Sequence, residues 1–177
     1  MLPLQQSDLL EVLVALTGSD DAQIAAAANE TLKAEASEDL LIAAKAEDTA
    51  PNVLAYLATQ PDGTPEIYEA TILNTRTPDQ ALAKLAGSTT HSSLLELLTI
   101  NQQRLVRCPE IIDAILQNPA CGGEAERRAR ETRTEFFEKE RGARQIAEEL
   151  RARGHIACIH AAKIVTRCIL PVSSIAG

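Results

Sequence analysis

The stretch "TPEIYEATILNTRTPDQALAKLA", residues 64–86, gives the strongest indication of the fold, because it contains two helix starts thirteen positions apart. Thr64 and Thr77 are each followed by a proline and an acid, and a threonine hydroxyl can accept a hydrogen bond from the first turn of a helix. Proline suits the first helical position, and the acid lies at the positive end of the helix dipole. Gln80, three positions after Thr77, completes a capping box. The stretch therefore predicts two short helices that begin at the prolines, with both threonines as N-caps.

The same signal recurs along the chain at a nearly constant spacing. Helix starts are predicted at Pro51, Pro65, Pro78, Ser92 and Pro109. The motifs "VLAYLA" at 53–58 and "ALAKLA" at 81–86 align at a separation of twenty-eight positions, so the repeating unit is a pair of short helices. A fixed period of this size is typical of a helical solenoid.

The predicted helices also end alike, and the N-terminal region follows the same pattern less regularly. Asparagine, which tolerates left-handed backbone, ends three of them, so a left-handed C-cap is expected at Asn74, Asn101 and Asn118. Ahead of the regular repeats, Ser7, Ser19 or Asp21, and Ser37 are expected to open three more helices, and Gly18 closes the first.

On this pattern, roughly residues 7–120 resemble the HEAT-like and leucine-rich-variant families of α-helical repeat proteins. The resemblance implies an all-α fold, in which helix pairs stack into a short solenoid of the right-handed type. A non-repetitive helical bundle is the alternative fold. The predicted division is a repeat array over residues 1–121, a long charged amphipathic helix over 122–154, and a short apolar packing segment with a loose tail over 155–177.

The long helix is predicted over 124–153, with an interruption at Gly142. Its apolar stripe repeats at spacings of four and three, a heptad seam made of Ala125, Ala129, Thr132, Phe136, Lys139, Ala143, Ile146 and Leu150. Four Glu–base pairs in the favourable order each add about 0.2–0.5 kcal/mol to an isolated helix, namely Glu124–Arg128, Glu126–Arg130, Glu135–Lys139 and Glu140–Arg144. Because Thr132 and Lys139 break the seam, packing within the same chain is expected rather than a strong dimer. A monomer or a weak homodimer through this helix is the predicted state.

The charge distribution argues against a nucleic-acid partner. The net charge is −8, of which residues 1–50 contribute −8, residues 51–120 contribute −3 and residues 121–177 contribute +3. A nucleic-acid binder would show an uncompensated basic stripe with stacking aromatics. The chain start lacks the basic and apolar regions of a signal peptide, and the longest apolar run is too short to span a bilayer. No membrane partner is predicted, and four scattered cysteines favour reduced thiols in a cytoplasm.

Candidate chemistry is sparse in this sequence. His155, Cys158, His160 and Cys168 form the one cluster of metal-type residues, but they lack the tight ligand pairs of structural zinc sites. No phosphate-binding, dinucleotide-binding or nucleophile-elbow motif occurs, and the serines after His91 are expected to cap a helix. We therefore predict no catalytic residue, no cofactor and no metal. An enzyme on a HEAT-like scaffold, a lyase or a glycosylase, is the alternative that the acidic charge disfavours.

The function that the sequence favours is a non-catalytic protein–protein interaction module, whose partner is another protein. Arginine outnumbers lysine in an alanine-rich chain, which hints at a bacterial source. Tyr56 and Tyr68 are expected on neighbouring helices, where core or groove packing is favoured over a ligand cage. The interaction candidates are Tyr56, Tyr68, Phe136, Phe137, Ile146 and Leu150.

Overall fold

The computed structural model describes residues 6–138, 145–146 and 148–153, and these residues are all-α with no strand among them. The described residues fall into two units, one that ends at Arg133 and one that begins at Thr134. The elements are α1 (Gln6–Leu16), α2 (Ala22–Ala34), α3 (Ser37–Lys45), α4 (Pro51–Thr59), α5 (Pro65–Leu73), α6 (Asp79–Ser88), α7 (Ser92–Ile100), α8 (Gln102–Arg107), α9 (Pro109–Gln117), α10 (Gly123–Thr132) and a π-helical turn, η1 (Arg133–Glu138). Residues 145–146 and 148–153 are also helical.

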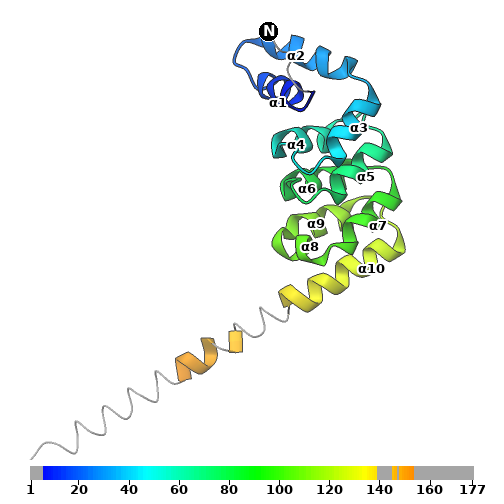
Figure 1. Cartoon of the computed structure of the whole chain (residues 1–177). Coiled ribbons are helices and arrows are strands. Elements are labelled where there is room, and N and C mark those ends of the chain that lie inside the picture. The colour runs from blue at the N-terminus through cyan, green and yellow to red at the C-terminus, as the bar shows by residue number, and fades with distance from the viewer. Residues whose placement is uncertain (1–5, 139–144, 147, 154–177) are drawn as a thin grey trace, which may run out of the picture. The chain divides into compact units, whose positions relative to one another are not determined.

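The helices of the first unit form two layers. In the first layer α1, α4, α6 and α9 contact one another in succession, and in the second layer α3, α5 and α7 do the same. α10 packs on α7 and α9, and Figure 1 shows the helices following one another in this stack. Leucine, isoleucine and alanine side chains fill the space between the layers, with Leu54, Leu82, Leu95 and Ile111 fully buried.

The repeat period of the sequence is present in the bounds of the helices. α5 begins and ends twenty-eight positions after α3, and α6 begins twenty-eight positions after α4. α7 follows α5 by twenty-seven positions, whereas α9 follows α6 by thirty because the short helix α8 is inserted before it. The predicted starts at Pro51, Pro65, Ser92 and Pro109 are confirmed, and α6 begins at Asp79, one position later than predicted.

The prediction that the side chains of Thr64 and Thr77 cap helices is wrong, because neither hydroxyl accepts a capping hydrogen bond. The carbonyl of Pro78 accepts the first hydrogen bond of α6, from the amide of Ala81 at 3.0 Å, so Pro78 is the N-cap. The hydroxyl of Thr77 instead donates to the carbonyl of Thr71 at 2.6 Å. Thr64 does stand at the N-cap position of α5, but its side chain makes no capping bond to a helix amide.

The predicted capping box is also wrong. The side-chain amide of Gln80 does not return to the start of α6 but approaches the Sγ of Cys108 at 3.6 Å. Asp21, in contrast, caps α2 as predicted, since its carboxylate accepts from the amides of Gln23 at 2.8 Å and Ile24 at 3.4 Å. A cap predicted from a residue pattern therefore fails where that residue has a closer tertiary partner.

The asparagines that end the helices do not adopt the predicted left-handed backbone. No residue other than glycine has a positive φ in the part of the chain that the structure describes. The side-chain amide of Asn118 instead donates to the carbonyls of Ala86 at 2.7 Å and Thr89 at 2.8 Å, one repeat earlier. Asn101 ends α7 and caps α8, where its side chain accepts from the amide of Arg104 at 3.2 Å.

Asn74 and Arg104 join successive repeats in the same way. The side-chain amide of Asn74 donates to the carbonyls of Ala44 at 3.0 Å and Ala46 at 2.9 Å. The buried guanidinium of Arg104 donates to the carbonyls of Asn74 at 2.6 Å and Thr77 at 2.9 Å. Each of these side chains therefore satisfies carbonyls at a helix end or in a loop of the preceding repeat.

The start of the predicted long helix packs on the array as expected. Ala125, Ala129 and Thr132 of the seam are buried, and α10 contacts α7 and α9. The predicted pairs Glu124–Arg128 at 2.8 Å and Glu126–Arg130 at 2.7 Å are confirmed. The remaining predicted pairs and the interruption of the helix involve residues outside the described ranges, namely Lys139, Glu140, Gly142 and Arg144.

Candidate interaction surface

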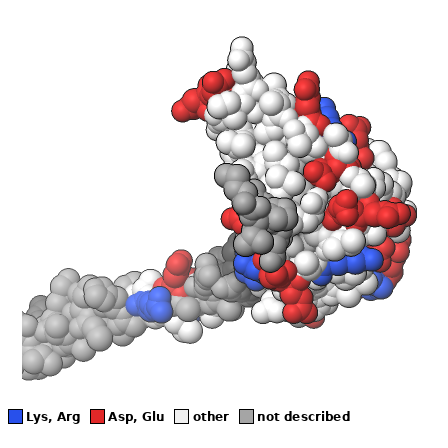
Figure 2. Space-filling model, turned by 45° about the horizontal axis from the view of Figure 1, so that its top comes forward, with Lys and Arg blue, Asp and Glu red and all other residues white. Residues whose placement is uncertain are grey.

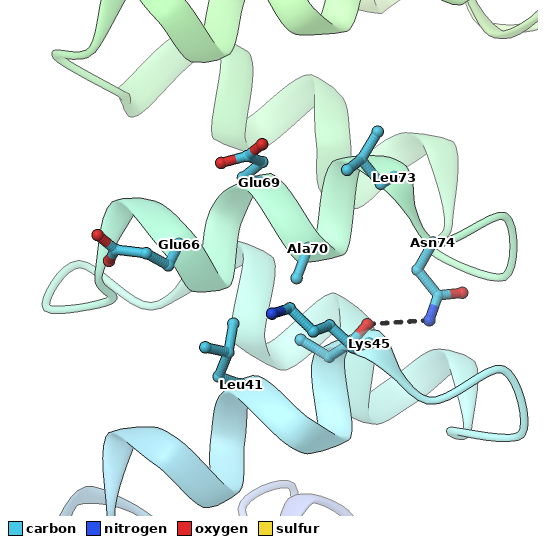
Figure 3. Close-up of a pocket in the computed structure, with 8 residues that line it drawn as sticks. Leu41, Lys45, Glu66, Glu69, Ala70, Leu73 and Asn74 are labelled. Atoms are coloured by element: carbon cyan, nitrogen blue, oxygen red, sulfur yellow. Dashed lines mark hydrogen bonds between the residues drawn. The ribbon is translucent and has the colours of Figure 1, made fainter.

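A groove of about 310 Å³ lies between α3 and α5 of the second layer. Figure 3 shows that residues of both helices line it, with α3 on one side and α5 on the other. Its lining residues are Leu41, Ala44, Lys45, Glu66, Glu69, Ala70, Leu73 and Asn74. The groove is therefore apolar at its base and charged along its rims.

We attribute the groove to two alanines, because the equivalent positions of the next repeat carry larger side chains. In the register of the helix bounds, Ala44 of α3 corresponds to Ile72 of α5, and Ala70 of α5 corresponds to Leu97 of α7. Ile72 is buried and Leu97 is half-buried. At the α3–α5 interface these two positions carry alanine, whereas the equivalent positions of the next repeat carry isoleucine and leucine. The smaller side chains leave space open between α3 and α5.

The rims of the groove carry exposed charges of both signs. Glu66 and Glu69 are exposed on α5, and Lys45 is exposed on α3. Neither Lys45 nor Glu69 forms an ion pair within 4.0 Å among the described residues. Hydrogen bonds from its own backbone amide and from Thr64 lower the pKa of Glu66, which is therefore ionised at neutral pH.

One end of the groove is closed by a fixed polar side chain. Asn74 donates both hydrogens of its amide to carbonyls of the α3 end, as the dashed line to the Ala44 carbonyl in Figure 3 shows for one of them. Its side-chain oxygen accepts from the amide of Arg76 at 3.0 Å. Because these bonds use its donors, Asn74 sets the shape of the groove and leaves ligand contacts to the apolar and charged side chains.

A second cavity of about 220 Å³ lies near the loop between α4 and α5, and Tyr56 lines it. Leu32, Leu40, Leu57 and Ile67 give it an apolar wall. Tyr56 is half-buried, and this burial raises the pKa of its phenol. The predicted candidate Tyr56 is therefore a lining residue of this smaller cavity.

Tyr68 lies elsewhere, with only 7% of its surface exposed. Its hydroxyl donates to the carbonyl of Gln60 and accepts from the amide of Gly63 at 3.0 Å. A Cβ added at Gly63 would lie 2.7 Å from the ring of Tyr68, so the glycine permits this close approach. Tyr68 thus fixes the α4–α5 loop and presents almost no surface to a partner.

The other candidates belong to the second unit. Phe136 is 41% exposed, Ile146 is 60% exposed and Leu150 is 61% exposed, whereas Phe137 is half-buried. Three of these four side chains thus have exposed apolar surface within the described part of the second unit.

The described residues offer no group of three or more His, Cys, Asp or Glu side chains that could hold a metal ion. The metal-type residues His155, Cys158, His160 and Cys168 lie outside the described ranges. His91 precedes α7 as its N-cap residue without a side-chain cap bond, and Ser92 is the first residue of that helix. A search of the described residues for a helix long and apolar enough to cross a bilayer finds none.

No protein-family model, curated protein or solved structure matches this chain. The sequence pattern did not single out the groove residues either. The groove could be recognised in the sequence only from the alanines at positions 44 and 70. These stand out only when the repeats are aligned by the bounds of their helices.

Proposed function

We propose that this chain is a non-catalytic protein-interaction module, which binds a segment of another protein on the second layer of its helices. The observation that carries the proposal is the groove between α3 and α5, where the regular repeat leaves a partly apolar surface uncovered. Exposed apolar surface rimmed by polar groups is typical of protein interaction sites.

The proposed architecture is a short right-handed solenoid of HEAT-like helix pairs. It is supported by the offset of twenty-eight positions that the pairs α3–α5 and α4–α6 share, and by the side chains of Asn74, Arg104 and Asn118 that satisfy carbonyls of the preceding repeat. Proteins of this kind act through continuous surfaces formed by successive repeats. Leu73 and Ile100 occupy the same register position at the ends of α5 and α7, and both are more than 60% exposed.

The chemistry of the rim supports binding rather than catalysis. A general acid needs a raised pKa near the working pH, whereas the pKa of Glu66 is lowered by its hydrogen bonds. An ionised and exposed carboxylate is suited to select a partner by charge. We place the module in the cytoplasm because its four scattered cysteines do not form the dense framework of disulfide-bonded secreted domains.

Site-specific photo-crosslinking in the native host tests the function. A photoreactive amino acid at Leu73, beside the groove, should capture a protein partner. The same group at Lys84, an exposed position of α6 in the other layer, is the matched control. Capture at Lys84 but not at Leu73 would contradict the proposal, as would the absence of a captured protein at every exposed position of α3, α5 and α7.

A further inference from the structure

We infer that the α3–α5 groove binds an amphipathic helical segment of another protein, in which lysine or arginine residues flank an apolar stripe. The inference rests on the proposed function and adds the chemistry of the partner. An apolar helix face in a groove is a common mode of peptide recognition, with anchors spaced three or four positions apart.

The base of the groove selects apolar side chains. Ala70 is 5% exposed and Ala44 has no exposed surface, so the small open area at the base lies at Ala70 and is apolar. Leu41 extends the apolar surface from α3 toward α5, and Leu73 lines the outer edge of the groove, where Figure 3 shows it directed away from α3. The missing volume corresponds to the branched side chains of Ile72 and Leu97 in the next interface, and similar side chains from a partner would fill it.

The surrounding charge selects basic groups. Residues 36–76, which include α3, α4 and α5, contain seven acids and two bases. Figure 2 shows acidic side chains recurring along one side of the molecule, with fewer basic ones among them. Complementary charge steers association and suppresses partners of the wrong sign, so an acidic partner segment is disfavoured.

The single lysine of the groove, Lys45, affects where the basic groups of a bound segment can lie. In Figure 3 the side chain of Lys45 extends from the end of α3 toward Ala70, whereas Glu66 and Glu69 lie farther along α5. Basic groups of the bound segment therefore lie along α5, away from Lys45. Replacing Lys45 by glutamate should make both rims acidic and strengthen the binding of a basic segment.

Fluorescence anisotropy with the full chain and defined peptides tests the inference. The probe is a labelled amphipathic peptide of leucine and lysine, and its leucine–glutamate counterpart is the charge control. The lysine peptide should bind and the glutamate peptide should not. Glu66→Gln and Glu69→Gln should each weaken binding by about two- to fivefold, the range for exposed charge pairs, and Lys45→Glu should strengthen it by a similar factor.

Two apolar variants locate the contact. Ala70→Leu copies the residue at position 97 and should abolish binding by filling the groove. Leu73→Gln changes an exposed side chain, so it keeps the fold and should weaken binding even if Ala70→Leu fails to fold. Glu30→Gln, at an exposed position of α2, is the matched charge control and should leave binding unchanged.

The outcomes separate this inference from the proposed function. Equal binding of both peptides, or no effect of Leu73→Gln on the lysine peptide, would overturn the basic-segment inference. If the Leu73 crosslink still captured a protein, the proposed function would stand. Self-association of the free chain that Leu73→Gln abolishes would identify a second copy as the occupant, and it would also overturn the inference.

Discussion

Asn118→Ala tests whether the side-chain amides that join successive repeats stabilise the array. Asn118 is 6% exposed, and it donates to the carbonyls of Ala86 and Thr89 at 2.7 and 2.8 Å. Its side-chain oxygen accepts from the amide of Ala120 at 2.8 Å. Each hydrogen bond contributes about 0.5–1.5 kcal/mol net, and a buried group left without a partner costs about 1–3 kcal/mol. We expect the free energy of unfolding to fall by about 2–4 kcal/mol.

Urea unfolding followed by far-UV circular dichroism measures this loss, with the slope of the transition checked because repeat arrays can lose cooperativity. Asn118→Asp should cost more than Asn118→Ala, since a carboxylate would face two carbonyl oxygens. Asn52→Ala, at an exposed position of α4, is the control and should be neutral or slightly stabilising, because alanine is the better helix former. A loss below about 0.5 kcal/mol for Asn118→Ala, the level of an ordinary surface change, would show that these amides do not hold the repeats together.

Three further predictions address the two loops that flank α5 and the first residue of α6. Thr77→Val removes a hydroxyl that donates to a carbonyl at 2.6 Å, so it should cost about 1 kcal/mol in urea unfolding, whereas exposed Thr90→Val should not. Gly63→Ala should cost about 1–3 kcal/mol by the same measurement, because the new Cβ would lie 2.7 Å from a tyrosine ring. A hydrogen bond from Arg107 lowers the pKa of Asp79 below its ordinary value of 3.8. This carboxylate therefore stabilises the fold above that pH, and its contribution is lost as the pH falls through the folded pKa. Asp79→Asn should remove this part of the dependence of the unfolding free energy on acid pH. An unchanged dependence on pH in the variant would contradict the assignment.

Helix positions in this chain could be predicted from the sequence because proline, which fixes φ, marks a helix start locally. The starts at Pro51, Pro65 and Pro109 needed no knowledge of the rest of the fold. The roles of Thr77 and Asn118 could not be predicted in this way. Each has a polar side chain that suits a local cap, but the hydroxyl of Thr77 donates back across its own loop to the carbonyl of Thr71, and the amide of Asn118 donates to the carbonyl of Ala86 in the preceding repeat. Local propensity predicted the elements, and tertiary geometry decided how polar groups were satisfied.

The candidate site was harder to predict, since the sequence draws attention to aromatic residues. Tyr68 is buried and fixes a loop, while Tyr56 lines the smaller cavity. The larger groove depends on two alanines, and alanine is common throughout this chain. Their role becomes visible only when α3 and α5 are aligned by their bounds, because Ala44 then corresponds to Ile72 in the next repeat.

Whether the groove is a consequence of packing or a retained binding site can be decided by filling it. Ala70→Leu adds three carbons to a surface that α3 and α5 already enclose on two sides. A fully buried methylene contributes about 0.8 kcal/mol, so half-burial of the added carbons should stabilise the array by about 1 kcal/mol in urea unfolding. Stabilising changes that remove a function are the expected signature of a site kept open for binding. A more stable variant that no longer binds the lysine peptide would therefore support a binding groove. A strongly destabilised variant would show instead that the alanine is required for the close packing of the two helices.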